Sequence, residues 1–85
     1  MEWFVYIIKS KSRTDKIYIG ATNNLERRIK DHNRGNTKST KNFIPWQLSY
    51  HEEYMSKKEA LCREKQLKRW KNRKRIENLI KNNRP

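Results

Sequence analysis

Apolar residues fall into short periodic segments along the chain, and three of these segments have the pattern of β-strands. Residues 3–9 and 16–21 are rich in aromatic and β-branched side chains, which favour strands. The polar turn at 10–15 between them is short, so an antiparallel hairpin is expected. A third strand is expected over 46–51, where the even-numbered residues are apolar and would form one half-buried face.

Helical spacing of apolar residues and suitable capping residues predict three helices. Residues 34–42 lack apolar side chains and separate the first helix from the third strand. The element order ββαβαα predicts a single α+β domain over residues 1–85, with a three-stranded antiparallel sheet packed against helices. The helices and their N-terminal caps are 24–33 after Asn23, 56–71 from Ser56, and 73–82 after Asn72.

The charge of the chain points to a polyanionic partner. The 85 residues carry 22 Lys and Arg against 9 Asp and Glu, a net charge of +13. Residues 63–75 alone contain eight basic side chains and a single acid. Such an excess favours nucleic acid, although it does not separate a nuclease from a passive binding protein.

Several classes of protein are excluded by the same composition. No apolar run approaches the roughly 20 residues that span a bilayer, and no secretory signal is visible, so a cytoplasmic protein with no membrane partner is expected. The only cysteine, Cys62, cannot form an internal disulfide or a cysteine-rich zinc site.

Three polar side chains occupy positions where helical spacing would place core residues. Arg28 and His32 share a face with apolar residues of the first helix, and Glu64 lies on the apolar stripe of the second. A partly buried carboxylate is costly unless it is paired. Glu64 is therefore either in an ion pair, with Arg28 or Lys68, or a ligand of Mg²⁺, which prefers oxygen ligands.

Two tyrosines of the predicted hairpin, Tyr6 and Tyr18, alternate with aliphatic neighbours, so both hydroxyls are expected on one face of the sheet. Packing alone would also explain them. Gly20, near the end of the second predicted strand, permits a close approach of another group to its backbone.

The sequence resembles the GIY-YIG endonuclease domain, and especially its small single-domain bacterial members, which are similar to the N-terminal nuclease domain of the excision-repair protein UvrC. Order and spacing of the motifs match across about residues 3–70, with Phe4 in place of the first motif's glycine. The matching segments are Val5-Tyr6-Ile7, Tyr18-Ile19-Gly20, Leu25-Glu26-Arg27-Arg28 followed by His32, and Arg63-Glu64-Lys65-Gln66-Leu67-Lys68.

This resemblance implies a catalytic set. The implied roles belong to Tyr6, Tyr18, Arg28 and Glu64, with His32 as an accessory, and Glu64 would hold one Mg²⁺ or Mn²⁺. Arg28 can bind phosphate oxygens in a bidentate way. Tyr6 would help to deprotonate the attacking water, with Tyr18 orienting the water or acting as the base instead, and direct attack by a tyrosine stays open. We expect the nearby cations, Arg28 and the metal, to lower the tyrosine pKa from about 10 for the role of base.

Exposed basic residues are expected to contact the phosphate backbone, although a solvated helix face is the simpler explanation for them. The predicted nucleic-acid contacts are Arg27, Lys38, Lys41, Arg63, Lys65, Lys68, Arg69, Lys71, Arg73 and Lys74.

The sequence therefore predicts a metal-dependent endonuclease that cuts DNA. We expect it to prefer branched or flapped DNA structures over particular sequences, and to act in repair or recombination. The competing interpretations are a non-catalytic nucleic-acid-binding module and an interaction subunit that needs a protein partner. The oligomeric state does not follow from the sequence.

Overall fold

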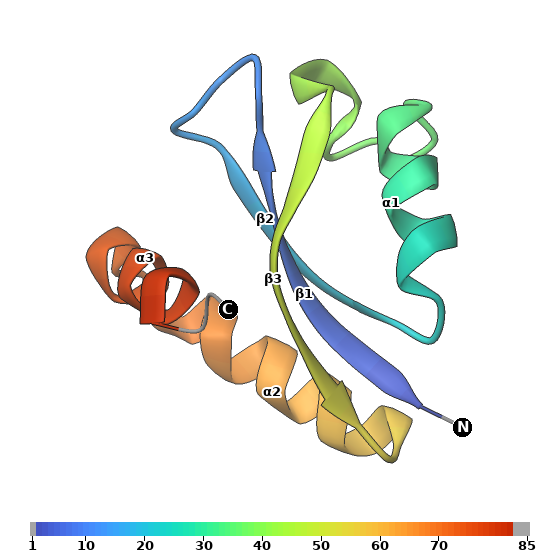
Figure 1. Ribbon diagram of the computed structural model, residues 1–85, viewed down its shortest axis with the longest axis vertical. Coiled ribbons are helices and arrows are strands. Elements are labelled where there is room, and N and C mark those ends of the chain that lie inside the picture. Colours follow the sequence, from blue (N-terminus) through green and yellow to red (C-terminus); the bar gives the residue numbers. More distant parts are fainter. Residues whose placement is uncertain (1, 83–85) are drawn as a thin grey trace.

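The computed structural model describes residues 2–82. Its sheet has the strand order β2-β1-β3 with antiparallel pairing throughout. Helix α1 covers one face of the sheet, and α2 and α3 cover the other (Figure 1). The predicted α+β order is confirmed. The elements are β1 (Trp3–Ser10), β2 (Ile17–Thr22), α1 (Leu25–Asn33), the 3₁₀ turn η1 (Lys41–Phe43), β3 (Trp46–Tyr54), α2 (Lys57–Arg69) and α3 (Arg73–Asn82).

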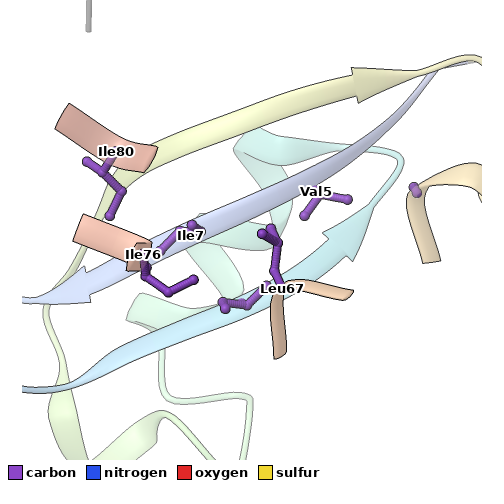
Figure 2. Packing of buried hydrophobic residues seen from close by; sticks show 7 residues of the cluster. Val5, Ile7, Leu67, Ile76 and Ile80 are labelled. Atoms are coloured by element: carbon purple, nitrogen blue, oxygen red, sulfur yellow. The ribbon is translucent and has the colours of Figure 1, made fainter. Parts of the chain in front are cut away.

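The central strand β1 is buried on both faces, which explains its nearly continuous apolar sequence. Val5 and Ile7 point toward α2 and α3, where Leu67 and the α3 isoleucines pack against them (Figure 2). Tyr6 and Ile8 point the other way, toward α1. The chain thus has two small cores separated by one sheet.

The third strand does not keep one apolar face, so the expectation of simple alternation over 46–51 is wrong. Leu48 lies opposite Ile8, whereas Tyr50 lies opposite the preceding residue, Ile7, and Ser49 has no partner in the register. This β-bulge turns Tyr50 toward α2 and α3, while Trp46 packs on the α1 side. The strand also continues three residues further, to Tyr54.

The helix caps follow the predicted chemistry with one shift. The side chain of Asn24, not Asn23, accepts a hydrogen bond from the Arg27 backbone N–H, so α1 begins one residue later. Ser56 caps α2 as predicted. That helix ends before Lys71 because this residue adopts a left-handed φ of 47°.

The third predicted cap is also present. Asn72 accepts from the Arg75 backbone N–H at 3.2 Å, in the first turn of α3. Across residues 2–82, none of the helices is both long and apolar enough to cross a membrane.

Candidate active site

The pairing of β1 with β2 brings the two hairpin tyrosines together. Tyr6 lies opposite Gly20 and Tyr18 lies opposite Ile8, so both tyrosines are on the α1 face, with ring centroids 6.3 Å apart. Gly20 makes room for the Tyr6 ring, because a Cβ atom at that position would lie 2.4 Å from the Tyr6 hydroxyl oxygen. The glycine therefore sets where the Tyr6 hydroxyl sits.

Helix α1 supplies two partners for that hydroxyl. Arg28 Nε donates a hydrogen bond to Tyr6 Oη at 3.3 Å, and His32 Nε2 lies 2.9 Å from the same oxygen. Arg28 and His32 are one turn apart, so both side chains reach the sheet from one helix face. The neighbouring Arg27 is exposed to solvent.

A buried threonine completes this hydrogen-bond chain. His32 Nδ1 lies 2.8 Å from Thr40 Oγ1, and Thr40 Oγ1 donates to the Thr37 carbonyl at 3.4 Å. Because the Thr40 hydroxyl donates its hydrogen bond to the Thr37 carbonyl, the Thr40 oxygen accepts one from His32 Nδ1–H. His32 Nε2 then carries no proton and accepts a hydrogen bond from the Tyr6 hydroxyl. Each hydrogen bond of the series Arg28–Tyr6–His32–Thr40–Thr37 then has one donor and one acceptor.

Thr40 was absent from the sequence-based site. It is fully buried, and its carbonyl accepts from the indole N–H of Trp46 at 2.9 Å. The segment 34–42 contains no apolar residue, so its sequence carries no signal for a buried position there. The role of Thr40 as the partner of His32 becomes visible only in the folded structure, where this loop lies against His32.

The ionisation of Tyr6 and His32 is governed mainly by burial. Burial raises the pKa of Tyr6 to about 12, although the hydrogen bond and charge of Arg28 lower it. The expectation that nearby cations bring the Tyr6 pKa below its ordinary value is therefore wrong for the protein groups around it, because desolvation outweighs Arg28.

His32 is shifted in the opposite direction. Burial lowers the pKa of His32 to about 4, and the Arg28 charge adds to this effect. His32 is therefore neutral at pH 7, in agreement with its role as an acceptor for Tyr6. Burial also lowers the pKa of Arg28, but its interactions with Tyr6 and Tyr18 raise it above the ordinary value and keep the guanidinium charged.

Glu64 approaches the tyrosines from α2, on the other face of the sheet. Its side chain is 17% exposed and its Oε2 lies 2.8 Å from Lys68 Nζ. The Lys68 ammonium also lies 5.8 Å from the centre of the Tyr18 ring. Of the two ion pairs weighed for Glu64, the structure contains the one with Lys68.

The donor set around Glu64 suits a magnesium ion only in part. Within residues 2–82 no cluster of three or more His, Cys, Asp or Glu side chains could enclose a metal. Mg²⁺ is often held by one or two carboxylates, with waters and substrate phosphates filling the other positions. Glu64 fits that role, provided that the ion competes with Lys68.

Two predicted nucleic-acid contacts, Arg63 and Arg73, bind acidic partners within the fold, as Lys68 does. Arg63 makes two hydrogen bonds to Glu52, at 2.9 and 3.1 Å. Burial would raise the pKa of Glu52, but hydrogen bonds from Arg63, Tyr50 and Tyr54 hold it below the ordinary value. Arg73 binds Glu77 and the backbone carbonyls of residues 14 and 15.

The remaining eight predicted contacts are, like Arg73, exposed. Five of them lie on α2 and α3 or the turn between these helices, one lies on α1, and two lie in or beside η1. The first five are Lys65, Lys68, Arg69, Lys71 and Lys74; the residue on α1 is Arg27; the two in or beside η1 are Lys41 and Lys38.

Comparison with known proteins agrees with this arrangement. The GIY-YIG catalytic domain matches residues 2–78. The chain belongs to the GIY-YIG family. This membership supports an endonuclease-type function and DNA as the substrate. In GIY-YIG terms, Phe4 stands at the first-motif glycine position, where its ring packs edge-on against His51 with centroids 6.1 Å apart.

Similar members of this GIY-YIG group are small bacterial proteins. The UPF0213 protein CPE1444 of Clostridium perfringens is 45% identical over 67 residues, which is 78% of this chain and 70% of the relative. The UPF0213 protein SH2523 of Staphylococcus haemolyticus is 39% identical over 74 residues, covering 86% and 88% of the two chains. The solution NMR structure of the UPF0213 protein BH0048 from Bacillus halodurans matches with a TM-score of 0.60 and 32% identity, over 98% of this chain and 86% of that one.

Proposed function

We propose that this chain is a divalent-metal-dependent endonuclease that hydrolyses DNA phosphodiester bonds, with selectivity for DNA structure rather than sequence, and that it acts in DNA repair or recombination. The observation that carries the proposal is the hydrogen-bonded group of Arg28, Tyr6 and His32 beside Tyr18. An arginine fixed next to two tyrosine hydroxyls is suited to hold a phosphate while a water is deprotonated.

Tyr6 and Tyr18 have different roles in this proposal. The Tyr6 hydroxyl is buried, donates to His32 and accepts from Arg28, so it holds Arg28 in place and is not free to take a proton. Tyr18 is half-buried and borders solvent, which makes it the better candidate for the base that receives a proton from the attacking water.

Arg28 binds the non-bridging phosphate oxygens through its guanidinium N–H donors, where negative charge grows during in-line attack. Glu64 holds the metal. When bound, the ion supplies Lewis-acid stabilisation of the leaving oxygen. The exposed cations of α2, α3 and η1 bind the flanking phosphates, which gives affinity without reading bases.

A second candidate, a nucleic-acid-binding module without turnover, is favoured by one observation. The carboxylate of Glu64 is already neutralised by Lys68, as it would be in a protein that needs no metal. Activity with a divalent ion separates the two.

The test is cleavage of branched, flapped and plain duplex DNA with and without Mg²⁺. We expect wild type to cut only with the ion, and Arg28→Ala to lower the rate about 10²- to 10³-fold, as for other removed transition-state donors. Lys30→Ala is the matched control, because Lys30 is exposed on α1 and pairs with Glu26 of the same helix.

Two results would contradict the proposal. Wild type that binds these substrates but never cuts them would exclude a catalytic function for the isolated chain. Cutting that survives Glu64→Ala at an unchanged rate would exclude Glu64 as the metal ligand.

A further inference from the structure

A pocket of about 450 Å³ opens beside Tyr18, at the free edge of β2. Its floor is aliphatic and its rim is basic. The floor is formed by Ile17, Ile19, Leu67 and Ile76, and the rim by Lys68, Lys71, Asn72 and Arg73.

Hydrogen bonds and ion pairs hold α3, and with it part of the rim, against the β1–β2 hairpin. Arg73 donates to the Thr14 and Asp15 carbonyls at 3.0 and 2.6 Å, and its Nε donates to Glu77 at 2.9 Å. Glu77 also binds Lys9 of β1. The wall around Arg73 is therefore tied to the β1–β2 turn and, through Glu77, to β1.

We infer that this pocket binds one nucleobase of the DNA substrate, turned out of the helical stack next to the scissile phosphate; the inference rests on the proposed function. Aliphatic walls match the apolar faces of a base, and enzymes that hold an extruded base use apolar surfaces in this way. Lys68 and Lys71, which are exposed at the rim, are placed for the phosphates on either side of that nucleotide.

The position of the pocket joins it to the candidate active site. Tyr18 borders the pocket and contacts His32, with ring centroids 5.0 Å apart. Lys68 lies on the rim and also binds Glu64. A base in the pocket would thus place its own phosphate near Tyr18 and Glu64.

This arrangement gives a physical reason for structure preference. A nucleotide in a flap or branch is already unpaired, so it enters the pocket without the cost of unstacking a paired base, which is a few kcal/mol. Asn72 uses its Oδ1 to cap α3, and the floor is aliphatic, so discrimination among the four bases is expected to be weak.

Binding of base-bearing and base-free probes tests the inference. The protein carries Arg28→Ala to prevent cleavage, and the probes are oligothymidylate and an abasic strand of equal length and phosphate number. At the same salt concentration we expect the abasic strand to bind about tenfold more weakly, on the scale of stacking contributions in single-strand-binding proteins.

Two readouts locate the effect. In NMR spectra, the amides of Ile17, Lys71 and Asn72 are expected to shift with oligothymidylate and much less with the abasic strand. Ile17→Asn is expected to remove the tenfold preference while leaving abasic binding unchanged, and Lys58→Gln, on the far side of α2, to retain it. The NMR comparison needs no substitution at the pocket, so it decides the question even where Ile17→Asn does not fold.

The outcomes separate this inference from the proposed function. Equal affinity for both strands, or shifts confined to residues outside the pocket, would overturn the base pocket even in a protein that cuts DNA. Base-dependent shifts at the pocket in a protein that never cuts would support the pocket while removing the nuclease proposal.

Discussion

Substitution of Gly20 by alanine tests the central contact of the candidate site. The added Cβ would lie 2.4 Å from the Tyr6 hydroxyl oxygen and 2.6 Å from Cζ. The Tyr6 side chain is 1% exposed and its hydroxyl is held by His32 and Arg28, so it cannot swing away at low cost. The substitution is therefore expected to destabilise the fold.

The magnitude follows from three contributions. In a strand, Gly→Ala alone would stabilise the fold by about 0.5–1 kcal/mol. Overpacking of a core costs about 1–3 kcal/mol. A buried acceptor on His32 that loses its hydrogen bond costs about 1–3 kcal/mol more. We therefore expect Gly20→Ala to lower the free energy of unfolding by about 1–5 kcal/mol, measured by urea denaturation with tryptophan fluorescence.

Two further substitutions identify the cause of that loss. Tyr6→Phe removes the atom nearest the new Cβ, so Gly20→Ala is expected to cost about 1 kcal/mol less in that background. Gly35→Ala is the matched control. Its added Cβ makes only an ordinary van der Waals contact, with Lys41 Cβ 3.8 Å away, and its cost arises from a φ of 79°, so Tyr6→Phe should not change that cost. A Gly20→Ala protein as stable as wild type, or one whose loss is the same with Phe at position 6, would refute the reasoning.

Two predictions concern the charges around the site. Because the folded pKa of His32, about 4, is below its ordinary 6.5, the neutral histidine stabilises the fold above pH 6.5, and this contribution is lost as pH falls. Between pH 7 and pH 4 the unfolding free energy should therefore fall by about 3 kcal/mol more in wild type than in His32→Gln, and parallel curves would contradict the pKa shift. Because Lys68 pairs with Glu64, Lys68→Met should tighten Mn²⁺ binding about two- to fivefold by electron paramagnetic resonance. Lys65→Met removes the same charge without that contact, so an equal change in both would show a general charge effect.

The fold was largely predictable because each element carries its own local signal. Ser56 and Asn72 are capping residues that predict the starts of two helices. The apolar run of β1 is typical of a strand that is covered on both faces. The bulge in β3 was not predictable. Leu48 and Tyr50 keep an apolar alternation in sequence while pointing to opposite faces, and nothing in that alternation reveals that Ser49 is extra.

The basic residues around the site show a second reason why sequence-based prediction is incomplete. Arg63 and Arg73 have the same local setting as their basic neighbours, so the charge run predicts DNA contacts for both. Glu52 is 11 residues from Arg63, and the carbonyls that bind Arg73 are 58 and 59 residues away. Whether a basic side chain is available to a phosphate therefore depends on tertiary contacts that a charge run does not encode.

The edge position of β2 links the two halves of the site. Arg28 and His32 reach the tyrosines from the α1 face, whereas Glu64 and Lys68 come from α2 on the opposite face. The two groups can meet at Tyr18 because β2 has no further strand beside it. A shift of β2 by one residue against β1 would turn both Tyr18 and Gly20 to the other face. The register of this single strand pair therefore determines whether the same residues form a site at all.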